Sequence, residues 1–221
     1  MITPYFQLFA YDPNQSYLRR TSKRRSRSFV QGFLKLHFTL LNGTGTTISI
    51  TDVDGNNLAV TTGQEMNHSL LSTSPGRGGF GMLINPGGAD SSSIIASSST
   101  NNGIVAGTGT TAVTPTDYQL ATLIADGTTA STLEYFTCAG TNFSTVGSTA
   151  SFDLERLFRN SSGGTITINE TGVYSAYSRN TSGGQFTHIR HFCTIRDIVS
   201  PGFAVLNGEY LRVVYTLSVT A

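Results

Sequence analysis

The chain has 221 residues, of which 12% are charged and 38% hydrophobic, and its formal net charge at pH 7 is +1. This length suffices for one large β domain or two small domains with a real core. The longest apolar runs are far shorter than the roughly 20 residues that span a bilayer, and the N-terminus lacks the pattern of a signal peptide. Abundant Gly and Thr between short apolar runs favour a mainly β protein over a helical one.

Positive charge is concentrated near the N-terminus. Residues 1–35 hold seven Lys and Arg against one Asp, whereas residues 36–221 hold seven against twelve acidic residues. The candidate docking cations are Arg19, Arg20, Lys23, Arg24, Arg25 and Arg27. We expect this basic arm to bind the surface of another protein. The alternatives are a solvated linker, phosphate contacts with nucleic acid, and a membrane surface, in falling order of preference.

Two apolar segments flank the basic run. Tyr5–Tyr11 reads as a short strand that could add to the edge of another sheet. Ser28–Leu41 has helical spacing, with Phe29, Phe33 and Leu36 on one stripe, and is predicted as an amphipathic helix. A buried strand is the alternative for part of this segment. We expect the stripe to dock on a neighbouring subunit.

The middle of the chain starts with a predicted β-hairpin, because alternating residues 46–50 and 58–62 flank a turn rich in Asp, Asn and Gly. Residues 72–103 are Gly/Ser-rich and read as loops. In Ile104–Leu133, a turn is expected at Thr114–Asp117. A short helix is expected after it, ending near Gly127. Its apolar positions would be Tyr118, Leu120, Ala121, Leu123 and Ile124.

The C-terminal third is dominated by strand patterns. Strands are predicted at residues 152–158, 165–169, 172–174 and 188–195. The final strand is the clearest, with Leu211, Val213, Tyr215, Leu217 and Val219 on one face. Asn207-Gly208 before it is typical of a two-residue hairpin turn.

Two motifs that suggest a cofactor or a metal fail in their context. Gly76–Gly81 has the spacing of a dinucleotide-binding loop, but no strand precedes it and Pro86 ends any helix after it. Asp52, Asp54 and Asn56 resemble the start of a calcium loop, yet Gly63 stands where the bidentate carboxylate is needed. We expect no cofactor and no metal.

Other reactive residue types give no catalytic pattern. His188 and His191 are three residues apart, so in a strand they point to opposite faces, and a structural pair is preferred over zinc. Cys138 and Cys193 could pair, but free buried thiols are favoured. The carboxylates Glu134, Asp153, Glu155 and Glu170 show no reason to share a cleft. A non-enzymatic protein is expected, and a small hydrolase using one of the histidines is a distant alternative.

Three stretches resemble a known family: GIVAGTGTTAVTPTDYQLATLIADGT (residues 103–128), SFDLERLFRNSSGGTITINETGVY (151–174) and FCTIRDIVSPGFAVLNGEYLRVVYTLSV (192–219). They are similar to uncharacterised structural proteins of tailed-bacteriophage and prophage virions. The shared motifs are turn and strand signatures, so no catalytic or binding residue carries over. The resemblance implies a virion subunit of the capsid-decoration, head-fibre, neck or tail-appendage type, and a homo-oligomer.

The expected architecture is an antiparallel β-sandwich or jelly-roll-like body with an N-terminal arm and a short helix. The segments are residues 1–41 (arm and helix), 42–103 (hairpin and loops) and 104–221 (β-rich body), with 42–221 possible as one domain. The arm would anchor the chain to other virion proteins. A receptor-binding appendage, in which the loops at 72–103 face outward, is the alternative function.

Overall fold

The computed structural model describes residues 2–26, 29–41, 47–61, 80–81, 98–180 and 186–220. Within these residues the fold is mainly β, and all pairings between strands are antiparallel. The strands are β1 (Ile2–Tyr11), β2 (Tyr17–Arg20), β3 (Arg24–Arg25), β4 (Thr47–Thr51), β5 (Asn57–Thr61), β6 (Phe80–Gly81), β7 (Gly103–Gly107), β8 (Glu134–Val146), β9 (Thr149–Arg159), β10 (Ile166–Asn180), β11 (Phe186–Val205) and β12 (Tyr210–Thr220), and the helix is α1 (Gln31–Leu41).

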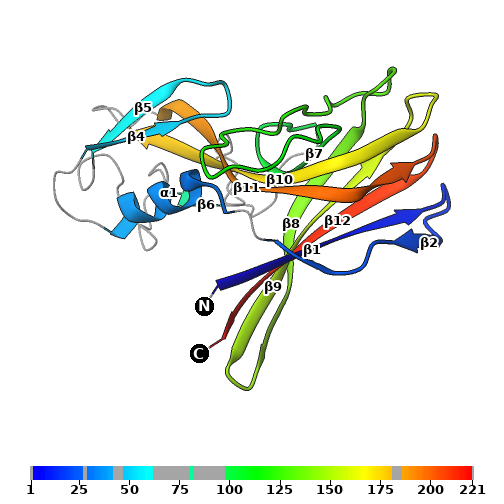
Figure 1. Ribbon diagram of the computed structural model, residues 1–221, viewed down its shortest axis with the longest axis horizontal. Helices are drawn as coiled ribbons and strands as arrows, with labels where there is room; N and C mark the ends of the chain where they lie inside the picture. Colours follow the sequence, from blue (N-terminus) through cyan, green and yellow to red (C-terminus); the bar gives the residue numbers. More distant parts are fainter. Residues whose placement is uncertain are drawn as a thin grey trace.

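Two sheets face each other as a sandwich (Figure 1). Sheet A has the order β2-β1-β12-β9-β8, with β3 also paired to β1. Sheet B has the order β11-β10-β6, with β7 also paired to β10. The hairpin β4–β5 forms a small separate sheet, as the sequence predicts. The mainly antiparallel, sandwich-like fold expected from composition and alternation is therefore confirmed.

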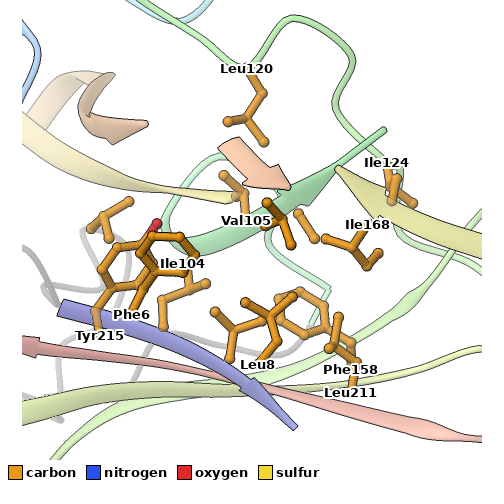
Figure 2. Packing of buried hydrophobic residues seen from close by; sticks show 14 of the residues in the cluster. Phe6, Leu8, Ile104, Val105, Leu120, Ile124, Phe158, Ile168, Leu211 and Tyr215 are labelled. Atoms are coloured by element: carbon orange, nitrogen blue, oxygen red, sulfur yellow. The ribbon is translucent and has the colours of Figure 1, made fainter. Parts of the chain in front are cut away.

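The core lies between the two sheets, where inward-facing residues alternate with outward-facing ones along each strand. On β12, Leu211, Val213, Tyr215 and Leu217 are buried, as predicted, whereas Val219 is 47% exposed. Figure 2 shows Leu211 and Tyr215 from sheet A in the same core as Val105 and Ile168 from sheet B. Arg156, which breaks the apolar alternation of β9, also points inward and is only 1% exposed.

The N-terminal strand lies inside sheet A. β1 pairs with β12 along its whole length, from Ile2↔Val219 to Tyr11↔Tyr210, and β2 and β3 pair with its other side. The strand expected at Tyr5–Tyr11 is thus present, but it is flanked on both sides within its own chain. The N-terminal residues are part of the body of the fold.

Two tight corners carry the chain between the sheets. The turn at Asn207-Gly208 joins β11 of sheet B to β12 of sheet A, so the expected two-residue hairpin is wrong: its flanking strands are not partners. A second corner, after Asn160, joins β9 to β10. Gly208 has φ +87° and donates its N–H to the Asn160 carbonyl, while Asn160 Nδ2 donates to the Val205 carbonyl at 2.8 Å. The two corners are therefore bonded to each other.

The segment after β7 is irregular where a short helix was expected, so that prediction is wrong. The turn at Thr114–Asp117 is present, because Asp117 N donates to the Thr114 carbonyl and Thr114 N donates to the Asp117 carboxylate. Beyond it, Ile124 N donates to the Ala106 carbonyl, which lays the segment along β7 instead of coiling it. The apolar spacing read as helical comes from Leu120 and Ile124 entering the core.

Candidate functional site

The basic run lies along one edge of sheet A. Arg19 and Arg20 are in β2, Lys23 precedes β3, and Arg24 and Arg25 form β3, whereas Arg27 lies outside the described residues. Arg20, Lys23 and Arg25 are exposed at this edge. Lys23 Nζ lies 5.2 Å from the centroid of the Tyr5 ring. Five of the six cations singled out by the sequence thus lie along this edge, four of them in strands that pair with β1.

Arg19 is used inside the fold. Its Nη1 and Nη2 donate to the two carboxylate oxygens of Glu209 at 2.8 and 2.7 Å, and Nη2 also donates to the Ala204 carbonyl at 2.6 Å. Its guanidinium carbon lies 5.5 Å from the centroid of the Phe203 ring. The hydrogen bond from Arg19 is the main cause that lowers the pKa of Glu209. Arg19 therefore fastens β2 to the corner before β12.

The apolar stripe of the helical segment packs on its own chain. Phe29 forms a β-bridge with Ile195 of β11, and the Phe29 and Phe33 ring centroids are 4.0 Å apart. Leu36 is 1% exposed and clusters with Ile50 and Phe192. Docking of this stripe on a neighbouring subunit stays a prediction, and it would require α1 to leave β11.

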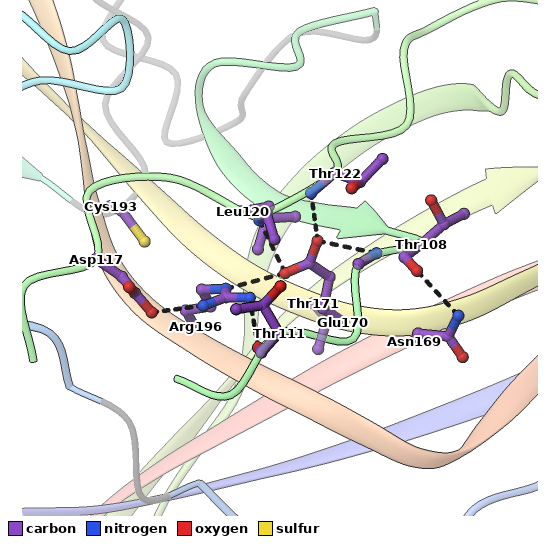
Figure 3. A network of polar contacts seen from close by, with 12 residues as sticks. Thr108, Thr111, Asp117, Leu120, Thr122, Asn169, Glu170, Thr171, Cys193 and Arg196 are labelled. Carbon is purple, nitrogen blue, oxygen red and sulfur yellow. Dashed lines mark hydrogen bonds and ion pairs between the residues drawn. The ribbon is translucent and has the colours of Figure 1, made fainter. Parts of the chain in front are cut away.

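A buried charged network fixes the segment after β7 to sheet B (Figure 3). Glu170 of β10 is fully buried, and its carboxylate accepts hydrogen bonds from the backbone N–H groups of Gly109, Ala121 and Thr122 at 2.7–3.1 Å. Arg196 Nε of β11 donates to the same carboxylate at 2.9 Å. Four donors, three from one long loop and one from β11, thus converge on one side chain of β10.

Arg196 links Glu170 to the turn at Thr114–Asp117. Its Nη1 lies 2.5 Å from Asp117 Oδ2, and its Nη2 donates to the Thr111 carbonyl at 2.9 Å. Burial acts to raise the pKa of Asp117, but hydrogen bonds from Thr114 and Arg196 outweigh it and lower that pKa. For Arg196, burial lowers the pKa, and the bonds to Asp117 and Glu170 outweigh it and raise it. The charged forms of Asp117 and Arg196 are therefore favoured. We call the network of Glu170, Arg196 and Asp117 the clasp, because it holds the segment after β7 on sheet B.

Both cysteines are buried, and His191 is partly buried. Cys138 and Cys193 are free thiols in different sheets, and burial raises the pKa of Cys138 to about 11. Burial lowers the pKa of His191, while the side chain of His188 lies outside the described part of the chain. In that part, no three His, Cys, Asp or Glu side chains are grouped to hold a metal. Most of Gly76–Gly81 also falls outside it.

The outer face of sheet A, which points away from sheet B, contains a recess of about 410 Å³. We call this hollow the sheet A recess; its lining includes Tyr11, Gln15, Phe136, Glu155, Tyr210 and Arg212. These residues come from β1, the turn after it, β8, β9 and β12. Cross-strand register explains the gathering, because Tyr11 lies opposite Tyr210, and Val214, two residues after Arg212, lies opposite Glu155.

Aromatic rings and one ion pair form the walls. The ring centroids of Phe136 and Tyr210 are 6.1 Å apart. Arg212 Nε donates to Glu155 Oε2 at 3.0 Å, and Arg212 Nη2 donates to the same oxygen. Burial lowers the pKa of Arg212, but hydrogen bonds to Glu155 and Tyr11 outweigh it and raise that pKa. Among the described residues, Glu155 Oε1 receives no hydrogen bond.

Sequence reasoning missed this recess. Its residues are spread from position 11 to position 212, and only strand register brings them to one place. The available signal was the second face of the final strand, where Tyr210 and Arg212 alternate with the core residues. Aromatic and Arg side chains on a solvent-facing strand face are typical of recognition surfaces.

Comparison with known proteins finds no matching family model, no matching curated protein and no matching solved structure. Within the described residues, no helix is long and apolar enough to cross a membrane.

Proposed function

We propose that this chain is a non-enzymatic structural subunit of a bacteriophage virion, anchored to neighbouring virion subunits. The observation that carries the proposal is one end of sheet A, which extends past sheet B in Figure 1. We call this part the projecting end; it consists of residues 141–151 of β8 and β9 with their turn, and residues 216–220 of β12. Register places these segments side by side, because Thr149 lies opposite both Val146 and Thr220.

The projecting end is uncharged and exposes large apolar side chains. Phe143 is 76% exposed, Val146 is 75% exposed and Val219 is 47% exposed. The sequence holds no Asp, Glu, Lys or Arg from Tyr135 to Phe152. Burying such surface contributes about 25 cal/mol per Å², so a neighbouring subunit that covers this end would gain stability.

Two further features support a structural role. The charged side chains Glu170, Arg196 and Arg19 are engaged in contacts that hold the fold, as described above. The resemblance of residues 103–128, 151–174 and 192–219 to virion structural proteins points in the same direction. In this proposal the exposed cations Arg20 and Lys23 at the sheet edge contact an acidic surface of a neighbour, with nucleic acid phosphates as the alternative partner.

Incorporation of variants into particles tests the anchoring surface. Tagged wild-type and variant chains would be supplied during phage growth, and their amounts in gradient-purified particles would be measured by quantitative mass spectrometry. Phe143→Asp places a charge in the projecting end and is expected to reduce incorporation at least about tenfold, the effect of roughly 1.4 kcal/mol. Equal incorporation of Phe143→Asp and wild type would contradict the proposed anchor.

A matched control sits at the other end of the sandwich. Leu206 is 48% exposed at the corner between β11 and β12, outside the projecting end. Leu206→Asp introduces the same charge at another exposed apolar position and is expected to leave incorporation unchanged. Circular dichroism of both purified variants would show that each keeps the β fold.

A second candidate function, a receptor-binding appendage, is favoured by the sheet A recess. The Gly/Ser loops at residues 72–103, which sequence reasoning assigned to receptor contact, lie mostly outside the described residues. The sheet A recess offers a described alternative surface, since it combines aromatic walls with polar groups of both signs.

A further inference from the structure

The sheet A recess has the size of a small-ligand site. Its volume of about 410 Å³ falls within the roughly 300–1,000 Å³ typical of ligand pockets. A stable protein interface buries on the order of 800 Å² of surface from each partner and so extends well beyond a single hollow of this size. A compact molecule therefore fits the recess better than a protein surface does.

The recess presents aromatic rings to its occupant. Tyr11, Phe136 and Tyr210 line it and are each only partly buried, so ring surface remains accessible. Partly exposed rings gain free energy when an apolar face packs on them. An occupant should thus have a flat apolar face of about one ring.

The polar groups of the recess disfavour three ligand classes. An anion would compete with Glu155 for Arg212, and a cation would meet the Arg212 charge. A purely apolar ligand would cover Glu155 Oε1 and the Gln15 amide without giving them hydrogen bonds, which costs free energy. What remains is a neutral ligand that both donates and accepts hydrogen bonds.

Sugar rings meet both requirements, because one face of a pyranose carries C–H groups and its rim carries hydroxyls that donate and accept. We infer that the sheet A recess binds a neutral glycan, with a sugar ring packed on Tyr210 or Phe136 and its hydroxyls bonded to Glu155 and Gln15. This inference rests on the second candidate function, receptor binding, and does not depend on the anchoring role of the projecting end.

The direct test uses the purified full chain and simple neutral sugars. The methyl glycosides of glucose, galactose and N-acetylglucosamine would be titrated by saturation-transfer NMR, with sialyllactose as an acidic comparison. We expect at least one neutral probe to bind. Tyr210→Ala is expected to weaken that binding about tenfold, because it removes the packing of one aromatic ring.

A second variant removes the risk that the first fails to fold. Gln15 is exposed in the turn after β1 and has φ +63°, a conformation that glycine adopts without strain. Gln15→Gly therefore deletes the amide while preserving the turn, and we expect roughly threefold to tenfold weaker binding from the lost hydrogen bond. Tyr118→Ala, at an exposed aromatic residue outside the recess, serves as control and should bind like wild type.

Several results would overturn the inference. These are no binding of any neutral probe, binding of sialyllactose alone, or neutral binding that neither Tyr210→Ala nor Gln15→Gly weakens. Self-association that Tyr210→Ala abolishes, without any sugar bound, would assign the recess to a protein contact instead. None of these results bears on whether the chain is present in particles, so the two proposals fail separately.

Discussion

Replacing Glu170 by alanine is the sharpest test of the clasp that holds residues 107–126 on sheet B. The carboxylate is fully buried and bonded to Arg196, so its removal leaves a buried cation with part of its pairing lost. Breaking a buried ion pair in this way typically costs about 3–5 kcal/mol. Asp117 still pairs with Arg196, which places the expected loss toward the lower end of that range.

Of the three backbone donors, only one adds to the expected loss. Ala121 and Thr122 are exposed residues, so water can replace the lost acceptor there, whereas Gly109 is buried. One unsatisfied buried donor adds about 1–3 kcal/mol. We therefore expect Glu170→Ala to lower the free energy of unfolding by about 4 kcal/mol, a large share of the roughly 5–15 kcal/mol typical of a domain.

Urea unfolding at pH 7 measures this loss, with tyrosine fluorescence as the signal because the chain has nine Tyr and no Trp. Hydrogen exchange should also accelerate in peptides covering residues 107–122. Glu134→Ala is the control: its ion pair to Arg159 spans 3.8 Å at the surface and should contribute less than about 1 kcal/mol. If Glu170→Ala cost no more than Glu134→Ala, the clasp would not hold the loop.

Three further predictions concern the corner at Asn160, the ion pair between Arg19 and Glu209, and the two buried thiols. Asn160→Ala should lower the free energy of unfolding by about 1–3 kcal/mol in urea titrations, because the buried Val205 carbonyl loses its donor, whereas water can replace the donor at the exposed Gly164; a loss below about 0.5 kcal/mol would contradict this. Arg19→Met removes the hydrogen bond that lowers the pKa of Glu209 below its ordinary 4.5. The loss in free energy of unfolding should be constant above pH 4.5 and should decrease as the pH falls through the lowered pKa of Glu209. A loss that does not change with pH would refute this. Cys138 and Cys193, both buried, should resist iodoacetamide at pH 8 until the protein unfolds, and mass spectrometry of labelled native protein checks it.

The sequence predicted β9 and β12 because burial on one face leaves a period-two pattern that is local. It predicted no strand at β8, whose second half is largely exposed on both faces, and it divided β10 into two shorter strands. The final strand shows this most clearly, with Leu211 to Leu217 buried at alternate positions. Hairpin β4–β5 was also predictable, since its turn and its strands are adjacent in the chain. Arg156 interrupts the apolar alternation of β9, and the structure shows it buried, with its guanidinium donating to three backbone carbonyls.

The errors share a physical cause, which is dependence on distant partners. The segment from Tyr118 to Ile124 is straightened by Glu170, 48 residues after Thr122, and no local pattern reveals that acceptor. Asn207-Gly208 forms a tight turn in either case, but only the pairing of β12 with β1 and β9 makes it a corner between sheets. The sheet A recess was likewise hidden, because four strands supply its walls.

The central claim is that the chain is a virion subunit, and one measurement tests it most directly. Particles purified on a gradient from the source culture and treated with nuclease would be analysed by quantitative mass spectrometry. A virion subunit would be present in a fixed number of copies per particle, near that of the capsid subunit for a decoration protein and far lower for a neck or tail component. Absence of the chain from purified particles would contradict its assignment as a virion subunit.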